Sequence, residues 1–264
     1  MLLVPPYAAA AEAAGLLRSR GYAVLGPHGV AELAGCGLAA LLALTPSWDD
    51  LPPDAHLKDG GRYRRRRHSC FVLEGGLLTQ VPHRAHWQPV EYNALHGGMQ
   101  RWFEPMRPDV VSAPAWARLL RGLGRACSQV KGERPWSIEA HQFRIDTTDG
   151  IGRPTPEGAH RDGVDFVAVF LLAREGIKGG ETRVFEADGS AGQRFTLTEP
   201  WSLLLLDDER VIHETTPIQP TTGTGGHRDT LVLTYRAGGF QGDGSSGSER
   251  RPSPAATPST RPTA

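Results

Sequence analysis

The stretch His160-Arg-Asp-Gly-Val-Asp-Phe-Val-Ala-Val-Phe-Leu-Leu-Ala173 joins a polar turn to an apolar run that favours a β-strand. Short runs of the same texture, separated by turn residues, fill the C-terminal half of the chain. They cover residues 137–145, 164–173, 181–186, 193–197, 202–206, 210–215 and 230–236. Because no helical pattern separates these runs, they predict an antiparallel sandwich or barrel rather than a parallel βαβ sheet.

The N-terminal half has a different pattern. Stretches rich in alanine and leucine at 8–18, 30–44 and 113–130 have a helical period. We therefore expect one α+β domain over residues 1–240, with a helical part at about 1–130 and a β core at about 136–238. Residues 241–264 are rich in Gly, Ser and Pro and offer almost nothing to bury, which predicts a disordered tail.

Composition narrows the class of partner and the compartment. Lys plus Arg equals Asp plus Glu at 29 each, so no overall field would attract nucleic acid or an anionic membrane. The three cysteines form no CxxC pair, which favours a reducing compartment, and no apolar run approaches the ~20 residues of a membrane helix. We expect a cytoplasmic protein with a small-molecule partner; composition leaves its oligomeric state open.

A candidate metal site follows from the order of three residues. His160 and Asp162 form an HxD motif just before a β-run, and His213 lies in a later β-run. Two histidines and one carboxylate on one face of an iron ion leave positions open for a bidentate oxoacid and for dioxygen. A second HxD motif at 227–229 has no histidine after it and cannot supply this order. Taken singly, each of these residues would be read as a turn cap or a structural histidine.

An arginine after the second histidine would bind the far carboxylate of the oxoacid. Arg228 shares one face of its expected strand with Thr230, Val232, Thr234 and Arg236, because side chains alternate along a strand. At ~3.3 Å per residue, Arg228 and Arg236 are about 26 Å apart, so only one of them can serve the iron. We expect Arg228, which lies nearer the turn from His213.

Several ungapped blocks in this sequence resemble a known family. They are EYNALHGGMQRWFEP (91–105), HQFRIDTTDGIGRPTPEGAHRDGVDFVAVFLL (141–172), GGET (179–182), VIHETTPI (211–218) and HRDTLVLTY (227–235). Together they are similar to the 2-oxoglutarate/Fe(II) dioxygenases typified by bacterial L-isoleucine dioxygenase, over roughly residues 60–240.

The resemblance implies a double-stranded β-helix, a jelly-roll or cupin-like core, with flanking N-terminal helices. It implies Fe(II) bound by His160, Asp162 and His213, with 2-oxoglutarate bound by Arg228 and with O2 as the oxidant. The implied reaction is hydroxylation of an unactivated C–H bond of a free L-amino acid, or of a cyclic one such as pipecolate or proline. Succinate and CO2 would be released.

Other candidate residues rest on weaker patterns. Gln142 and Arg144 share one strand face, which either lines the pocket or faces solvent. Thr182 either binds 2-oxoglutarate or satisfies a hairpin, and Asp165 or Glu181 would pair with a substrate amine.

The arginine run at 62–67 provides a candidate for binding the substrate carboxylate. It lies in a stretch rich in Asp, Pro and Gly without secondary-structure period, so we expect a lid over residues 54–70. One or two of these arginines, such as Arg67 together with Tyr63, would bind the carboxylate while the rest stay solvated.

Two alternatives remain open at the level of the sequence. One is a hydroxylase of a residue held on a carrier protein or a peptide, which needs a wide cavity mouth. The other is a non-catalytic β-barrel binding module that retains the fold.

Overall fold

The protein is built from long and short β-strands together with helices, most of which lie in the N-terminal half. The structure, a computed structural model, describes residues 2–243 except 94, 96 and 190. The strands are β1 (Tyr7–Ala8), β2 (Tyr22–Leu25), β3 (Arg64–Glu74), β4 (Leu77–Gln80), β5 (Trp136–Asp146), β6 (Phe166–Glu175), β7 (Ile177–Gly179), β8 (Thr182–Glu186), β9 (Gly192–Phe195), β10 (Ser202–Asp207), β11 (Val211–Thr215), β12 (Ile218–Pro220) and β13 (His227–Arg236). The helices are α1 (Ala13–Arg20), α2 (Pro27–Ala34), α3 (Leu38–Leu42), α4 (Pro108–Val111) and α5 (Pro114–Lys131), with 3₁₀ turns η1 (Ala10–Glu12) and η2 (Thr45–Trp48).

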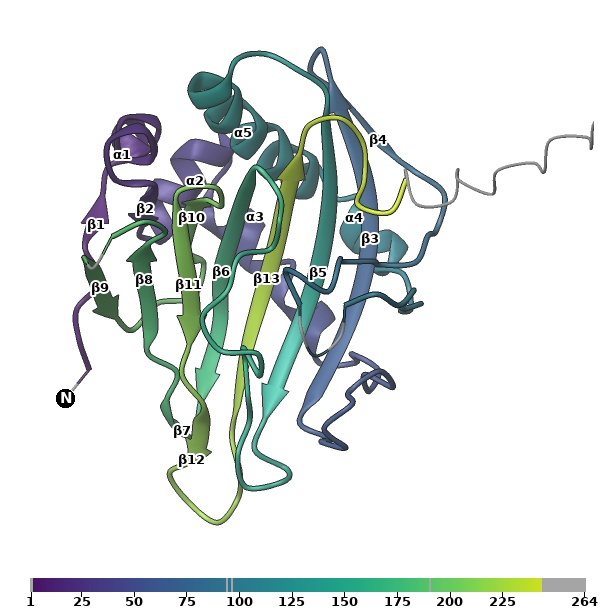
Figure 1. Ribbon diagram of the computed structural model, residues 1–264, viewed down its shortest axis with the longest axis vertical. Coiled ribbons are helices and arrows are strands. Elements are labelled where there is room, and N and C mark those ends of the chain that lie inside the picture. The colour runs from purple at the N-terminus through teal and green to yellow at the C-terminus, as the bar shows by residue number, and fades with distance from the viewer. Residues whose placement is uncertain (1, 94, 96, 190, 244–264) are drawn as a thin grey trace, which may run out of the picture.

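The strands form one large and two small sheets (Figure 1). The large sheet has the order β1-β2-β10-β6-β13-β5-β3-β4, and its pairs are antiparallel except for β1 with β2. The small sheets are β11-β8-β9 and β12-β7. At its centre β13 pairs with both β5 and β6, and β5 pairs in turn with β3.

One face of the large sheet packs against the helices and forms the main core. Inward side chains of the central strands, such as Ile138 and Leu233, join Leu17 of α1, Val30 of α2 and Trp116 of α5 in one buried cluster. Burial of this apolar surface is the main stabilising contribution to the fold.

Glycines fix how the covering helices end and approach one another. Helices α1 and α2 end at Gly21 and Gly35, which adopt the left-handed conformation that favours glycine. Within α5, a Cβ atom on Gly122 would collide with the backbone carbonyl of Leu33, so this position allows α5 to lie directly against α2.

The opposite face of the large sheet carries the small sheet β11-β8-β9. A second apolar cluster joins them, with Val167 and Leu171 of β6 meeting Val184 of β8 and Phe195 of β9. The paired antiparallel sheets and the flanking helices confirm the expected double-stranded β-helix.

The N-terminal part differs from the expectation in one respect. The region 1–130, expected to be helical, also contributes strands β1 to β4 to the large sheet. Strand β3 contains four arginines of the run at 62–67, so the expected lid over 54–70 is wrong from Arg64 onward. Within the expected lid, residues 54–63 contain no helix or strand. The tail prediction for 241–264 falls mostly on residues 244–264, which lie outside the described residues.

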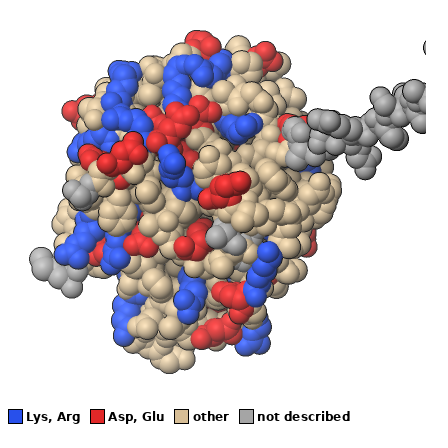
Figure 2. All heavy atoms as spheres, viewed as in Figure 1, with Lys and Arg blue, Asp and Glu red and all other residues tan. Residues whose placement is uncertain are grey.

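The surface reflects the balanced charge of the sequence. Figure 2 shows Lys and Arg side chains interspersed with Asp and Glu on the face in view, rather than gathered into a region of one sign. Within residues 2–243, apart from three omitted positions, no single helix is long and apolar enough to cross a membrane. One pair of helical segments, 27–34 and 38–48, passes that length and composition test only when joined across a bend of 95°.

Candidate active site

Three neighbouring strands of the large sheet supply one wall of a cavity on the face opposite the helices. Alternate residues of β13, from Arg228 to Arg236, line it, as do alternate residues of β5 from Ser137 to Ile145. The register continues onto β3, where Arg64 lies opposite Ile145 and Arg66 opposite Phe143. The period of two therefore directs every second side chain into the cavity and the intervening ones toward the helices.

The three predicted metal ligands meet at this cavity. The backbones of His160 and His213 exchange hydrogen bonds of 3.1 and 3.0 Å, which hold the two imidazoles side by side. The Nε2 atom of His160 lies 3.9 Å from Asp162 Oδ1, and Nε2 of His213 lies 4.0 Å from Asp162 Oδ2. Two ligand atoms at ~2.1 Å from one ion are at most ~4.2 Å apart, so these separations are compatible with a shared metal.

The two histidines differ in how readily they bind a proton. His160 Nδ1 lies 2.9 Å from the carbonyl oxygen of Gly158, so its N–H donates there and Nε2 is left with its lone pair. Burial, followed by the nearby His160, lowers the pKa of His213 to about 4, which keeps this ring neutral. For His160, burial lowers the pKa but the carboxylates of Asp162 and Glu157 outweigh it, and the net shift is upward.

The loop that carries Asp162 is held by a buried carboxylate and two glutamines. Asp208 accepts hydrogen bonds from the backbone N–H groups of Asp162, Gly163 and Val164, at 2.7 to 3.1 Å. Burial and the charge of Asp162 raise the pKa of Asp208 to about 7. Gln88 donates to Asp162 Oδ1 at 3.2 Å, and Gln241 donates to the carbonyl oxygens of Asp162 and Gly163. Gln241, the first residue of the expected tail, therefore packs on the metal loop.

Arg228 provides a buried cation in the same cavity. It is 4% exposed, and within the described part of the chain it forms no ion pair. Burial, reinforced by the charge of Arg174, lowers its pKa to about 10. A desolvated guanidinium beside another arginine is stabilised by an anionic ligand. Thr182 is buried at the start of β8 opposite Thr215 and is not among the residues that line the cavity.

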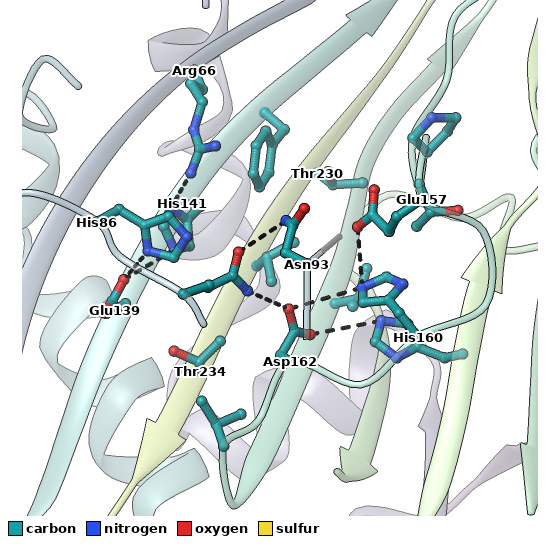
Figure 3. A pocket seen from close by; sticks show the side chains of 18 of the residues that line it. Arg66, His86, Asn93, Glu139, His141, Glu157, His160, Asp162, Thr230 and Thr234 are labelled. Atoms are coloured by element: carbon teal, nitrogen blue, oxygen red, sulfur yellow. Dashed lines mark hydrogen bonds and ion pairs between the residues drawn. The ribbon is translucent and has the colours of Figure 1, made fainter. Parts of the chain in front are cut away.

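The other end of the cavity is lined by further charged residues. Arg64 and Arg66, two members of the arginine run expected to contain a substrate ligand, enter it from β3. The sequence reasoning missed Arg101, which enters from a loop, and Glu139 and His141, which enter from β5. Figure 3 shows Glu139 and His86 at one end of the cavity, His160 and Asp162 at the other, and Asn93 between them. The alternation Arg64-x-Arg66-x-His68 was the available signal for a strand, but a run of arginines resembles a solvated loop.

Gln142 and Arg144 do not line this cavity, which corrects the first expectation. They occupy the alternate positions of β5 and point toward the helical side. The fully buried Gln142 donates to Ser47 Oγ at 2.7 Å. Arg144 pairs with Asp229 at 2.7 Å and with Asp49 at 3.1 Å, so its charge stabilises the fold instead.

Four further substrate candidates also lie elsewhere. Tyr63 donates its hydroxyl to Asp59 at 2.7 Å and packs in a separate apolar cluster. Arg67 lies opposite Gln142, on the face of β3 that points away from the cavity, and it pairs with Glu104 at 2.8 Å. Asp165 accepts hydrogen bonds from Lys131 Nζ and the backbone of Ala237, and Glu181 pairs with Arg183. None of these four residues lines the cavity.

Comparison with known proteins identifies the class. A family model described as 2OG-Fe dioxygenase matches residues 45–234, and the chain therefore belongs to the 2OG-Fe dioxygenase family. Enzymes of this family use Fe(II), 2-oxoglutarate and O2, and the expected enzyme class and cofactors are confirmed. When bound, the iron and its cosubstrate supply oxidation of a C–H bond, coupled to conversion of 2-oxoglutarate to succinate and CO2.

Solved structures support the same fold. A bsmA homologue from Methylobium petroleophilum PM1 is 54% identical, with a TM-score of 0.85, over 90% of this chain and 97% of that one. IDO from Bacillus thuringiensis is 17% identical with a TM-score of 0.71, over 90% of this chain and 100% of that one. The Fe(II)/α-ketoglutarate-dependent dioxygenase TqaL is 19% identical with a TM-score of 0.65, over 84% of each chain. No curated protein matches the sequence.

Proposed function

We propose that the enzyme hydroxylates an unactivated C–H bond of a free L-amino acid, including cyclic ones such as pipecolate or proline. The observation that carries this proposal is a single cavity that joins the His160, Asp162 and His213 cluster to an excess of buried positive charge. The excess is suited to two anionic guests, namely the cosubstrate and the carboxylate of a small substrate.

The iron would be held by His160, Asp162 and His213. Their ligand atoms lie within 4.8 Å of one another, and both imidazoles present a nitrogen toward the carboxylate. Arg228 would bind the distal carboxylate of 2-oxoglutarate, because it is buried, lines the same cavity and forms no ion pair with a described residue. A fork of two N–H groups matches a carboxylate in geometry and charge.

Arg101 is the best candidate for the substrate carboxylate. It is 2% exposed, and burial followed by the charge of Arg64 lowers its pKa to about 10. Arg64 has a carboxylate partner, Asp54, at 2.7 Å, whereas Arg101 has no ion pair with a residue in the described part of the chain. Arg101 instead donates to Gln88 Oε1 at 3.0 Å, and Gln88 in turn donates to Asp162. This short chain of contacts places the free cation close to the metal site.

The proposal is tested by succinate release with Fe(II), 2-oxoglutarate and O2 against a panel of proteinogenic and cyclic L-amino acids. We expect substrate-dependent succinate from at least one free amino acid, together with a product heavier by one oxygen atom in mass spectrometry. The methyl ester of that amino acid should react poorly, because it lacks the carboxylate. Equal activity on the ester, or activity confined to carrier-bound or peptide-bound residues, would reject a free amino acid as the substrate.

A further inference from the structure

A buried carboxylate at the end of the cavity away from the iron is surrounded by imidazoles. Glu139 Oε2 lies 2.5 Å from His86 Nδ1, 3.1 Å from His68 Nε2 and 3.5 Å from His141 Nε2. All four residues are 7% exposed or less. Glu139, His86 and His141 line the same cavity as the proposed iron ligands, so this cluster belongs to the substrate end of that cavity.

Hydrogen bonding fixes where the protons lie in this cluster. Arg66 Nη2 donates to His141 Nδ1 at 2.7 Å, and a guanidinium can only donate, so the ring proton of His141 is on Nε2. Burial lowers the pKa values of His68, His86 and His141, that of His86 to about 4, so all three rings are neutral. Each neutral ring can then direct one N–H group at Glu139.

Glu139 is thus held as an anion that forms no ion pair with a lysine or arginine of the described part of the chain. Burial alone would raise its pKa, but the charge that His86 acquires on protonation, followed by hydrogen bonds from the three imidazoles, outweighs burial and holds the pKa well below its usual range. Among the described residues its ion-pair contacts are with these histidines only, which carry no charge when neutral. The bonds from His68 and His86 go to Oε2, and no described residue donates to Oε1, which retains contact with the cavity. An unpaired buried charge is costly, so a cationic guest would stabilise it.

Arg101 lies in the same cavity and is close enough to feel the charge of Glu139, but it forms no ion pair with Glu139 or with another described residue. The backbones of His86 and Arg101 exchange two hydrogen bonds of 2.9 Å, and His86 contacts Glu139. The wall of the cavity therefore presents a guanidinium and a carboxylate from neighbouring positions. A free amino acid carries the two complementary charges on one carbon atom.

We propose that Glu139 binds the α-ammonium group of the substrate while Arg101 binds its α-carboxylate, so that the cavity selects free zwitterionic amino acids. This inference rests on the proposed function and narrows it. A residue within a peptide has lost both the ammonium group and the carboxylate, and a carrier-bound thioester has lost the carboxylate, so each lacks at least one of the two contacts.

A second metal ion is the competing occupant. The ligand atoms of His68, His86, Glu139 and His141 lie within 4.8 Å of one another, as a metal would require. However, the contact with Arg66 puts a proton on His141 Nε2, the atom that faces Glu139 and would have to bind the metal. Neutral rings directed at Glu139 Oε2 account for the contacts of the carboxylate, which favours an organic cation over a metal ion.

The test compares ligands that differ only in the ammonium group. Binding to the Fe(II) and 2-oxoglutarate-loaded enzyme is measured without oxygen by calorimetry, for the proteinogenic L-amino acids and L-pipecolate. Each bound amino acid is paired with the carboxylic acid in which hydrogen replaces the ammonium group. For pipecolate the partner is cyclohexanecarboxylate, in which a CH2 group replaces the ring NH2+ group. We expect the wild type to bind the amino acid on the order of 10- to 100-fold more tightly, as for a hydrogen bond between charged groups.

Variants then assign this preference to Glu139. Glu139→Gln should lose the preference by the same factor and keep its affinity for 2-oxoglutarate, and Glu139→Asp should retain part of it. Glu104→Gln is the matched control, because Glu104 is exposed and pairs with Arg67 outside the cavity. Circular dichroism verifies that the variants fold. The comparison of each amino acid with its ammonium-free partner uses the wild-type enzyme and does not depend on a variant.

Several outcomes would overturn the inference. They are equal wild-type affinity for the two members of a pair, unchanged preference in folded Glu139→Gln, or no amino acid bound by an enzyme that binds 2-oxoglutarate. Elemental analysis showing two tightly bound transition-metal ions per chain, with one lost in Glu139→Gln, would assign the cluster to a metal. Failure to bind 2-oxoglutarate at all would instead contradict the proposed function itself.

Discussion

Replacement of Arg228 by alanine should mainly weaken the binding of 2-oxoglutarate. Arg228 is 4% exposed and carries a charge that burial and Arg174 make unfavourable in the free enzyme. The dianion 2-oxoglutarate would stabilise this buried charge and form a bidentate, charge-assisted contact with the guanidinium. Loss of such a contact reduces the binding free energy by about 2–5 kcal/mol, and each 1.4 kcal/mol changes the dissociation constant by a factor of ten. We therefore expect the KM for 2-oxoglutarate to rise by ~30-fold or more.

Initial rates of succinate formation over a range of 2-oxoglutarate concentrations measure this effect, with the amino acid held at saturation. Arg228→Lys should be intermediate, because it keeps the charge but not the fork. Arg236→Ala is the control: Arg236 lies on the same face of β13 and lines the same cavity, but about 26 Å further along the strand at ~3.3 Å per residue. If Arg236→Ala raised this KM while Arg228→Ala left it unchanged, the assignment of the cosubstrate site would be wrong.

Four further predictions address the rest of the molecule. Alanine at any of the three proposed metal ligands should abolish turnover and lower the iron content measured by elemental analysis, whereas His227→Ala should remain active. Arg101→Ala should raise the amino-acid KM by ~10-fold or more in the succinate assay and leave the KM for 2-oxoglutarate unchanged. Removal of residues 244–264 should leave activity and Tm nearly unchanged, but removal of 241–264 should reduce turnover, because it also deletes the contacts of Gln241 with the metal loop. Arg144→Ala strands the buried carboxylate that Arg144 pairs with and should lower stability by about 3 kcal/mol in denaturant unfolding, without changing either KM.

The β core and the grouping of the metal triad could be predicted from order and local pattern. Alternating apolar runs without intervening helices define antiparallel strands, and β11 and β13 appear close to where the sequence places them. His160, Asp162 and His213 come together because a backbone bridge joins their two segments. The face of β13 was also predicted correctly, since Arg228 and its alternate neighbours line the cavity.

The substrate end could not be predicted in the same way. On β5, the sequence left open whether Gln142 and Arg144 line the pocket or face solvent, and the packing of η2 places them on the helical side instead. The neighbouring Glu139 and His141 face the cavity instead. Arg101 comes from a loop whose position depends on tertiary contacts, so no local pattern indicates that it faces the cavity.

The amide of Gln88 couples the binding of the amino acid to the binding of the metal. Its oxygen accepts a hydrogen bond from Arg101 and its nitrogen donates one to Asp162, so a single planar group contacts both residues. Occupancy of Arg101 by a carboxylate and occupancy of Asp162 by a metal are then linked equilibria that share this amide. If the bound amino acid changes the affinity of the enzyme for iron by some factor, bound iron must change the affinity for the amino acid by the same factor. Measuring either affinity with and without the other ligand therefore gives the same coupling free energy, and Gln88→Leu should bring it closer to zero.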